Sequence, residues 1–113
     1  MPEIVVVEVG GRRLGLPAAR VREVAAVSTV TPVPTAPPSV VGLTQLRGHI
    51  VPVIDLAAEP RTPRPNDPLI VVELGPARAA LLVDRVLGVQ PAEGVELLDV
   101  GALFDELRKK VHG

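Results

Sequence analysis

The sequence predicts a mostly β fold, with two small SH3-like β-barrels, the second of them incomplete, and one C-terminal helix. Residues 4–24 align without a gap on residues 69–89, with nine identical pairs at a constant offset of 65. A repeat of this length indicates two structural units of the same kind. The chain has 113 residues, 47% of them hydrophobic, but a single Phe and no Trp or Tyr. The core must therefore consist of Val, Leu and Ile, and the β-branched residues among them favour strands.

The two units differ in length. Residues 51–56 align on residues 95–100 at an offset of 44 instead of 65, so the second unit lacks about 21 residues. We expect one domain with a first barrel at 4–58, a proline-rich linker at 59–68, a reduced second barrel at 69–100 and a helix at 101–111. The second unit has no counterpart of the run at 40–46. A barrel without that strand leaves backbone groups unpaired along an edge, which the helix, the first unit or a partner must cover.

In the first unit, β-branched runs alternate with turn residues. The runs at 4–9 and 14–16 flank a glycine turn and predict a hairpin. Pro17 starts a short helical turn before an extended segment at 21–27. Four prolines at 31–38 predict a loop that takes no part in a sheet. The runs at 40–46 and 50–56 flank Arg47, Gly48 and His49 and predict a second hairpin.

The second unit repeats the opening hairpin at 69–74 and 79–83, after a linker with four prolines. The end of the chain has helical periodicity, because Leu103, Leu107 and Val111 fall on one face, with Phe104 beside them. Asp99 is placed to cap this helix. We expect the helix to cover the open sheet, with docking of a partner as the alternative.

Composition argues against catalysis, cofactors, metal sites and nucleic acid. There is no Cys, His49 and His112 are the only histidines, and the net charge is −1. Nucleophilic catalysis and metal binding need side chains that this sequence does not group together. A neutral chain without stacking aromatics is a poor ligand for nucleic acid. No basic segment precedes the first apolar run, which is too short to span a membrane. We expect a cytoplasmic protein without membrane insertion.

One segment resembles an enzyme signature. Leu98-Asp99-Val100-Gly101-Ala102 is similar to the active-site string of small dimeric aspartic proteases. Such an enzyme needs two facing aspartates that share a proton. Here Val100 replaces the hydroxyl residue, and the repeat pairs Asp99 with Asp55, which no glycine follows closely. An Asp that ends a strand and caps the helix is the preferred interpretation.

A charged pair gives a stronger hypothesis. Glu23 alternates with apolar neighbours, and Arg47 stands at the expected turn of a hairpin. If Arg47 folds back over the sheet, it forms a bidentate pair with Glu23. The alternative is an exposed pair of little energetic value. Both interpretations describe a surface for protein contact.

Residues 41–56, VGLTQLRGHIVPVIDL, resemble the signature of CheW-like chemotaxis coupling proteins. The pattern is Arg-Gly at a turn followed by Pro-x-x-Asp-Leu. The blocks at 21–24 and 82–86 agree with the same family, and the resemblance covers most of residues 4–104. It implies two SH3-like barrels joined side by side. It also implies a non-enzymatic adaptor that joins the cytoplasmic tips of chemoreceptors to the regulatory domain of a CheA-type histidine kinase.

The resemblance implies two protein-binding surfaces. Glu23, Val24 and Arg47, with Gly48 at the turn, map to the first-barrel surface that faces the kinase. Val21, Val86 and Leu87 map near the groove between the barrels, where receptor helices dock in an apolar setting. We expect recruitment to receptor clusters.

The short segment between Val89 and Val95 departs from the family pattern. Members have there a loop and strands that complete the second barrel and its contact in kinase–coupler rings. We therefore expect an accessory coupler of the FrzB type, with weakened kinase binding. The alternatives are a free-standing SH3-like interaction module and a homodimer in which two incomplete barrels exchange strands. Contacts with other CheW-like proteins fit either view.

Overall fold

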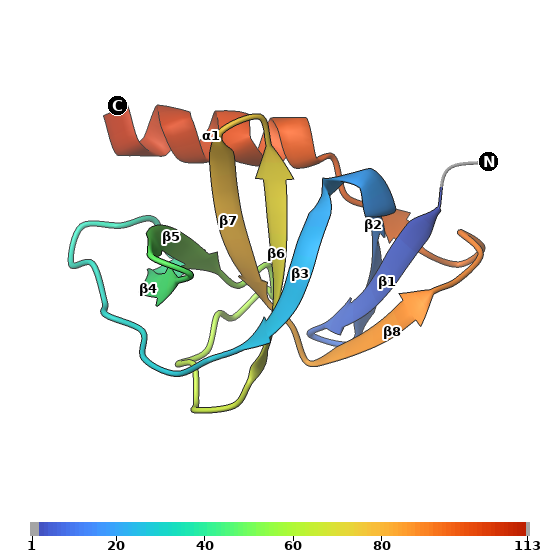
Figure 1. Cartoon of the computed structure of the whole chain (residues 1–113), viewed down its shortest axis with the longest axis horizontal. Coiled ribbons are helices and arrows are strands. Elements are labelled where there is room, and N and C mark those ends of the chain that lie inside the picture. The colour runs from blue at the N-terminus through green and yellow to red at the C-terminus, as the bar shows by residue number, and fades with distance from the viewer. Residues whose placement is uncertain (1–2, 113) are drawn as a thin grey trace.

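The computed structural model describes the backbone of residues 3–112 and the side chains of residues 3–108. The predicted β fold with one C-terminal helix is confirmed (Figure 1). The helix includes Val111 and His112, whose side chains lie outside the described part. The elements are β1 (Ile4–Val9), β2 (Arg12–Pro17), a 3-10 turn η1 (Ala18–Arg20), β3 (Val21–Ala26), β4 (Val40–Leu46), β5 (His49–Ile54), β6 (Pro68–Leu74), β7 (Ala77–Leu82), β8 (Arg85–Val89), β9 (Glu96–Leu97) and α1 (Val100–His112).

The strands form two sheets of unequal size. One sheet has five strands in the order β3-β6-β7-β5-β4, and the other has four in the order β8-β1-β2-β9. Each sheet is built around one hairpin. In the five-stranded sheet this is β6–β7, with β6 antiparallel to the edge strand β3 and β7 parallel to β5. In the four-stranded sheet it is β1–β2, with β1 antiparallel to the edge strand β8 and β2 parallel to β9. The two orders therefore match strand for strand, except that nothing corresponds to β4.

The registers of the two sheets are also equivalent. Val5 pairs with Val89 as Ile70 pairs with Val24, and both edge strands carry a bulge, at Leu87 and at Arg22. These pairs reproduce the offset of 65. The parallel ladder follows the second offset, because Leu97 pairs with Gly15 where Val53 pairs with Ala80. The repeat read from the sequence is thus a repeat of hydrogen-bonded geometry.

The sheets do not follow the expected division of the chain at the linker 59–68. The hairpin β1–β2 joins β8 and β9, whereas the hairpin β6–β7 joins β3, β4 and β5. The two halves of the chain have exchanged their hairpins. A hairpin is determined by local turn chemistry, but the third strand that it pairs with is chosen by long-range packing. The similar sequences of the two hairpins gave no indication of this exchange.

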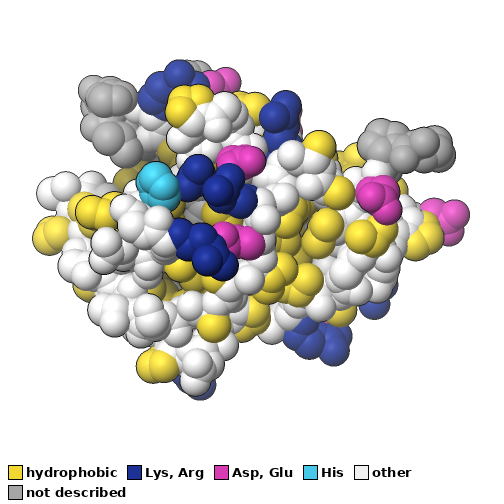
Figure 2. Space-filling view, in the orientation of Figure 1, with side chains coloured by type: hydrophobic (Ala, Val, Ile, Leu, Met, Phe, Trp, Pro, Cys, Tyr) yellow, Lys and Arg dark blue, Asp and Glu magenta, His cyan; other side chains and the backbone are white. Residues whose placement is uncertain are grey.

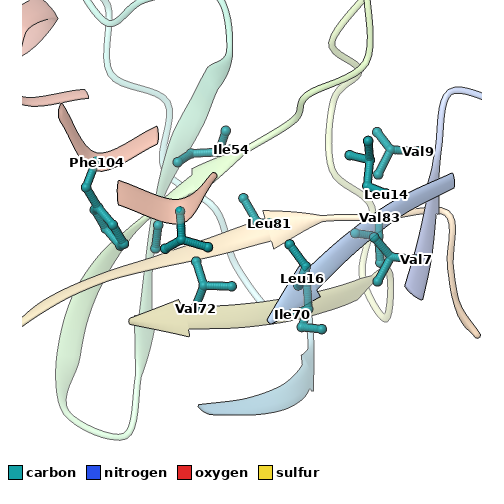
Figure 3. Packing of buried hydrophobic residues seen from close by; sticks show 12 residues of the cluster. Val7, Val9, Leu14, Leu16, Ile54, Ile70, Val72, Leu81, Val83 and Phe104 are labelled. Atoms are coloured by element: carbon teal, nitrogen blue, oxygen red, sulfur yellow. The ribbon is translucent and has the colours of Figure 1, made fainter. Parts of the chain in front are cut away.

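Two clusters of apolar side chains form the core. The larger one lies between the sheets and combines residues from both of them with Val100 and Phe104 of α1. In Figure 3, Phe104 enters this cluster from one side, and Val7 and Val9 of β1 lie at the other. The smaller cluster draws its strand residues from the five-stranded sheet alone and also includes Val27, which follows β3; its members are Val27, Val51, Val53, Leu69, Val71, Ala80 and Leu82. Among the described residues, the four-stranded sheet has no second cluster of this kind.

Leu97 shows what the missing strand exposes. Its repeat partner Val53 is fully buried (0% exposed), whereas Leu97 is 61% exposed. In the five-stranded sheet, β4 lies beside β5, and Val30 and Val41 pack against the smaller cluster. In the sequence repeat, only residues 90–94 correspond to the segment that contains β4. The expectation of an incomplete second unit with an open edge is confirmed in the described part of the chain.

The loop at 31–38 and the start of α1 test two local predictions. The loop at 31–38 was expected to stay out of the sheets, but Thr31 forms an isolated bridge with Leu43, with both N–H···O distances at 2.8 Å. Thr31 has the backbone N–H that the prolines lack, so it can pair at the edge of β4. The expected cap of α1 is confirmed, because the Ala102 N–H donates to Asp99 Oδ1 at 3.0 Å.

Candidate protein-binding surfaces

The turn between β4 and β5 places Arg47 at the surface. Arg47 and Gly48 both have positive φ, at 49° and 79°. A two-residue hairpin loop with left-handed conformation at both positions matches the twist of the strands, and glycine tolerates that conformation best. The Arg-Gly pair is therefore a turn that presents the arginine. His49 begins β5 and is exposed.

Arg47 reaches back to β3, as the sequence predicted. Its Nε donates to Glu23 Oε2 at 2.8 Å. The contact is one charge-assisted hydrogen bond, so the expected bidentate geometry is wrong. The Arg47 side chain is 73% exposed, whereas that of Glu23 is only 22% exposed. The hydrogen bond and the charge of Glu23 raise the pKa of the Arg47 guanidinium. The pair joins the β4–β5 turn to an edge strand and leaves the guanidinium facing solvent.

More ion pairs surround this contact. Glu73 of β6 receives Arg22 at 3.1 Å and Arg78 at 3.8 Å. Glu23, Arg22, Arg78 and Arg47 line one small hollow, which Figure 2 shows as neighbouring blue and magenta side chains. This network was not predicted from the sequence. The identities Glu8/Glu73 and Arg13/Arg78 of the repeat were the available signal, since each Glu faces its Arg across a hairpin.

The residues assigned to the groove lie on the two edge strands. Val21 of β3 and Val86 of β8 are half-buried, and both pack against the core between the sheets. Leu87 is the bulge residue of β8 and is also half-buried. Val24 stands apart from this set, 55% exposed on the same strand as Glu23. In Figure 2, apolar side chains gather beside the charged network, over the region where β3 and β8 lie in Figure 1.

The two aspartates of the repeat act as acceptors for backbone groups. Asp55 is buried, and its carboxylate accepts from the N–H of Ala57 at 2.9 Å and of Arg61 at 3.1 Å. Asp99 caps α1. Each carboxylate holds the segment that follows its own strand, and this arrangement explains both residues without a shared proton. Among the described residues, no group of three His, Asp or Glu side chains could hold a metal ion.

These features match one protein family. Residues 3–109 match the model of the CheW-like domain. The chain belongs to the CheW family. FrzA of Myxococcus xanthus is 35% identical over 95 residues, covering 80% of this chain and 59% of FrzA. Chemotaxis protein CheW of Rhizobium meliloti is 31% identical over 88 residues, covering 74% of this chain and 57% of the relative.

A solved structure supports the same assignment. The scaffolding protein TtCheW of Thermoanaerobacter tengcongensis superposes with a TM-score of 0.68 at 34% identity, covering 85% of this chain and 67% of TtCheW. The chain spans slightly under three fifths of the length of the curated relatives it matches. The names of these relatives describe a chemotaxis protein and a scaffolding protein. No helix in the described part of the chain is long and apolar enough to cross a membrane.

Proposed function

We propose that the chain couples chemoreceptors to a CheA-type histidine kinase as an accessory adaptor with weakened kinase binding. The observation that carries the proposal is the pairing of a complete five-stranded sheet with a four-stranded sheet that lacks the equivalent of β4. The family resemblance implies that a member with both units complete has two surfaces for ring contacts. This chain keeps one complete unit and the apolar region between the sheets.

The proposed kinase surface consists of Glu23, Val24 and Arg47, with the Gly48 turn holding the arginine in place. Its chemistry fits a protein interface, since Val24 is 55% exposed and the exposed Arg47 is already oriented by a carboxylate. Arginine and apolar side chains of this kind often dominate binding energy. The proposed receptor surface consists of Val21, Val86 and Leu87, where an amphipathic helix would lay its apolar face.

The test measures binding of the purified chain to two baits, a chemoreceptor signalling tip and the regulatory domain of a CheA-type kinase. We expect clear receptor binding and kinase binding weaker than that of a full-length CheW protein. Arg47→Ala should weaken kinase binding about tenfold or more, as for a hot-spot arginine. Arg85→Ala is the matched control, because Arg85 makes a 2.8 Å ion pair with Glu8 on the other sheet.

The outcomes separate the parts of the proposal. If the chain binds both baits with the affinity of a full-length CheW protein, the accessory role is refuted but the adaptor function is retained. Binding to neither bait would refute the coupling function. An equal loss of kinase binding with Arg47→Ala and Arg85→Ala would refute the assignment of the kinase surface.

A further inference from the structure

We infer that the vacant strand position beside β9 binds an extended, strand-forming segment of a partner protein that carries apolar side chains and a basic end. The five-stranded sheet of the same molecule shows how this position is filled. There β4 runs antiparallel to β5 over its full length, from Val40 opposite Ile54 to Leu46 opposite His49. β9 is the repeat counterpart of β5, and no strand of the described chain lies on its outer side.

The backbone of β9 has the groups that such a strand needs. In the complete sheet, the Asp55 N–H donates to the Ser39 carbonyl at 2.8 Å. Asp99 is the counterpart of Asp55, and no equivalent bond from its backbone N–H occurs within the described residues. The Leu98 N–H donates to the Gly15 carbonyl of β2 at 2.9 Å, so the backbone groups of its neighbour Leu97 face the opposite, outer side of β9. An exposed edge of this kind pairs with added strands in many peptide complexes.

The side chains beside β9 provide an apolar surface. Leu97 is 61% exposed and Val95 half-buried, and a Cβ built on Gly15 would lie within 3.1 Å of methyl groups of Ile4, Val95 and Leu97. These side chains therefore converge over Gly15. An open hollow next to them is lined by Ile4, Val89, Pro91 and Ala92. Val89 is 59% exposed. Apolar residues of an incoming strand would bury this surface as the residues around β4 bury Val53.

The charges around the site select a basic segment. Glu3 and Glu93 line the hollow, and both are exposed. Glu96 lies on β9, where Arg12 contacts it at 3.4 Å. By analogy with β4, a strand antiparallel to β9 brings its C-terminal end beside Glu93, because Leu46 faces His49 in the complete sheet. Lysine or arginine at that end would meet a carboxylate.

The inference is independent of the proposed coupling role, because it is tested with the chain and a synthetic peptide alone. The probe is the β4 sequence VVGLTQL followed by two lysines and labelled for fluorescence anisotropy. The control peptide carries Leu43→Pro, which removes a backbone donor and disfavours strand pairing. We expect saturable 1:1 binding of the probe, no binding of the control peptide, and weaker binding at higher salt.

Variants of the chain locate the site. Leu97→Ser should weaken binding about tenfold or more, and Glu93→Lys should weaken it further because the basic end loses its partner. Ile50→Ser is the matched control, since Ile50 is 72% exposed on β5 of the complete sheet. Both serine variants change exposed side chains, so both should fold. Amide exchange measured by NMR should slow at Leu97 and Asp99 when the probe binds.

Three results would overturn the inference. The first is no binding of the probe. The second is an equal loss of binding with Leu97→Ser and Ile50→Ser. The third is a concentration-dependent dimer, abolished by Leu97→Ser, whose formation excludes the probe. That last result would assign the vacant position to a second copy of the chain.

Discussion

Val53 and Leu97 occupy equivalent places in the two sheets, so truncating each to alanine compares a closed unit with an open one. Val53 is fully buried. Val53→Ala removes two carbons at about 0.8 kcal/mol each, and the cavity left behind brings the loss of stability to about 2–3 kcal/mol. Leu97→Ala removes three carbons, but the residue is 61% exposed. With less than half of that area buried, the loss should stay below about 1 kcal/mol.

Urea unfolding at 25 °C gives both free energies of unfolding, and the slope of the transition should be the same in both variants. In a thermal scan, Val53→Ala should lower the Tm by roughly 8–12 °C and Leu97→Ala by less than about 4 °C, given the Tm sensitivity of domains of this size. Ile50→Ala, at an exposed position of the complete sheet, serves as the control for a truncation without burial. If Leu97→Ala costs as much stability as Val53→Ala, the four-stranded sheet has a closed core and the argument for a vacant position fails.

Four further substitutions test other contacts. Asp55→Ala should lower the free energy of unfolding in urea by about 2–4 kcal/mol, because two backbone N–H groups lose their acceptor. Asp99→Ala should lower it by only about 1 kcal/mol, because only a helix cap is lost. Equal losses for the two variants would contradict the difference in burial between the two aspartates. Gly42→Ala should lower the free energy of unfolding by about 1–3 kcal/mol, since its Cβ would lie 2.6 Å from the Thr31 carbonyl oxygen. An unchanged Tm would show that the loop containing Thr31 moves away. Burial alone would raise the pKa of Asp67. Hydrogen bonds from the Arg61 side chain and the Arg64 N–H, together with the charges of both arginines, outweigh this effect, so the pKa is lowered. A lowered pKa gives stability that is present above the ordinary Asp pKa of about 3.9 and is lost as the pH falls below it. The wild type should therefore lose more stability than Asp67→Asn between pH 5 and pH 2, and parallel pH profiles would refute this role.

Some of the side-chain contacts at the surface were predictable from the sequence, and others were not. Glu23 and Arg47 were paired from their pattern and from the turn chemistry of Arg47-Gly48, and the structure brings them to 2.8 Å. The number of hydrogen bonds between them was not predictable, because it depends on the distance from the turn to β3. The pairing of Arg22 with Glu73 was not found, since it joins an edge strand to a hairpin 51 residues away.

The sequence by itself determined the strands, the hairpins, the repeat and the shortened second unit. These features follow from β-branched periodicity, glycine turns and two alignment offsets, which are local or directly countable properties. The registers of both sheets later reproduced the two offsets. The helix and its Asp99 cap belong to the same group, because capping acts within a few residues.

The tertiary structure alone decided which strands share a sheet. β1–β2 joins β8 and β9, and β6–β7 joins β3, β4 and β5, although either hairpin has the edge chemistry to pair with either third strand. The choice depends on how the two sheets bury Val7, Ile70 and Phe104 in one common cluster, and packing across such separations leaves no periodic trace in the sequence. The same reason explains Leu97: its apolar character is visible in the sequence, but its exposure arises because no strand of the described chain lies on the outer side of β9.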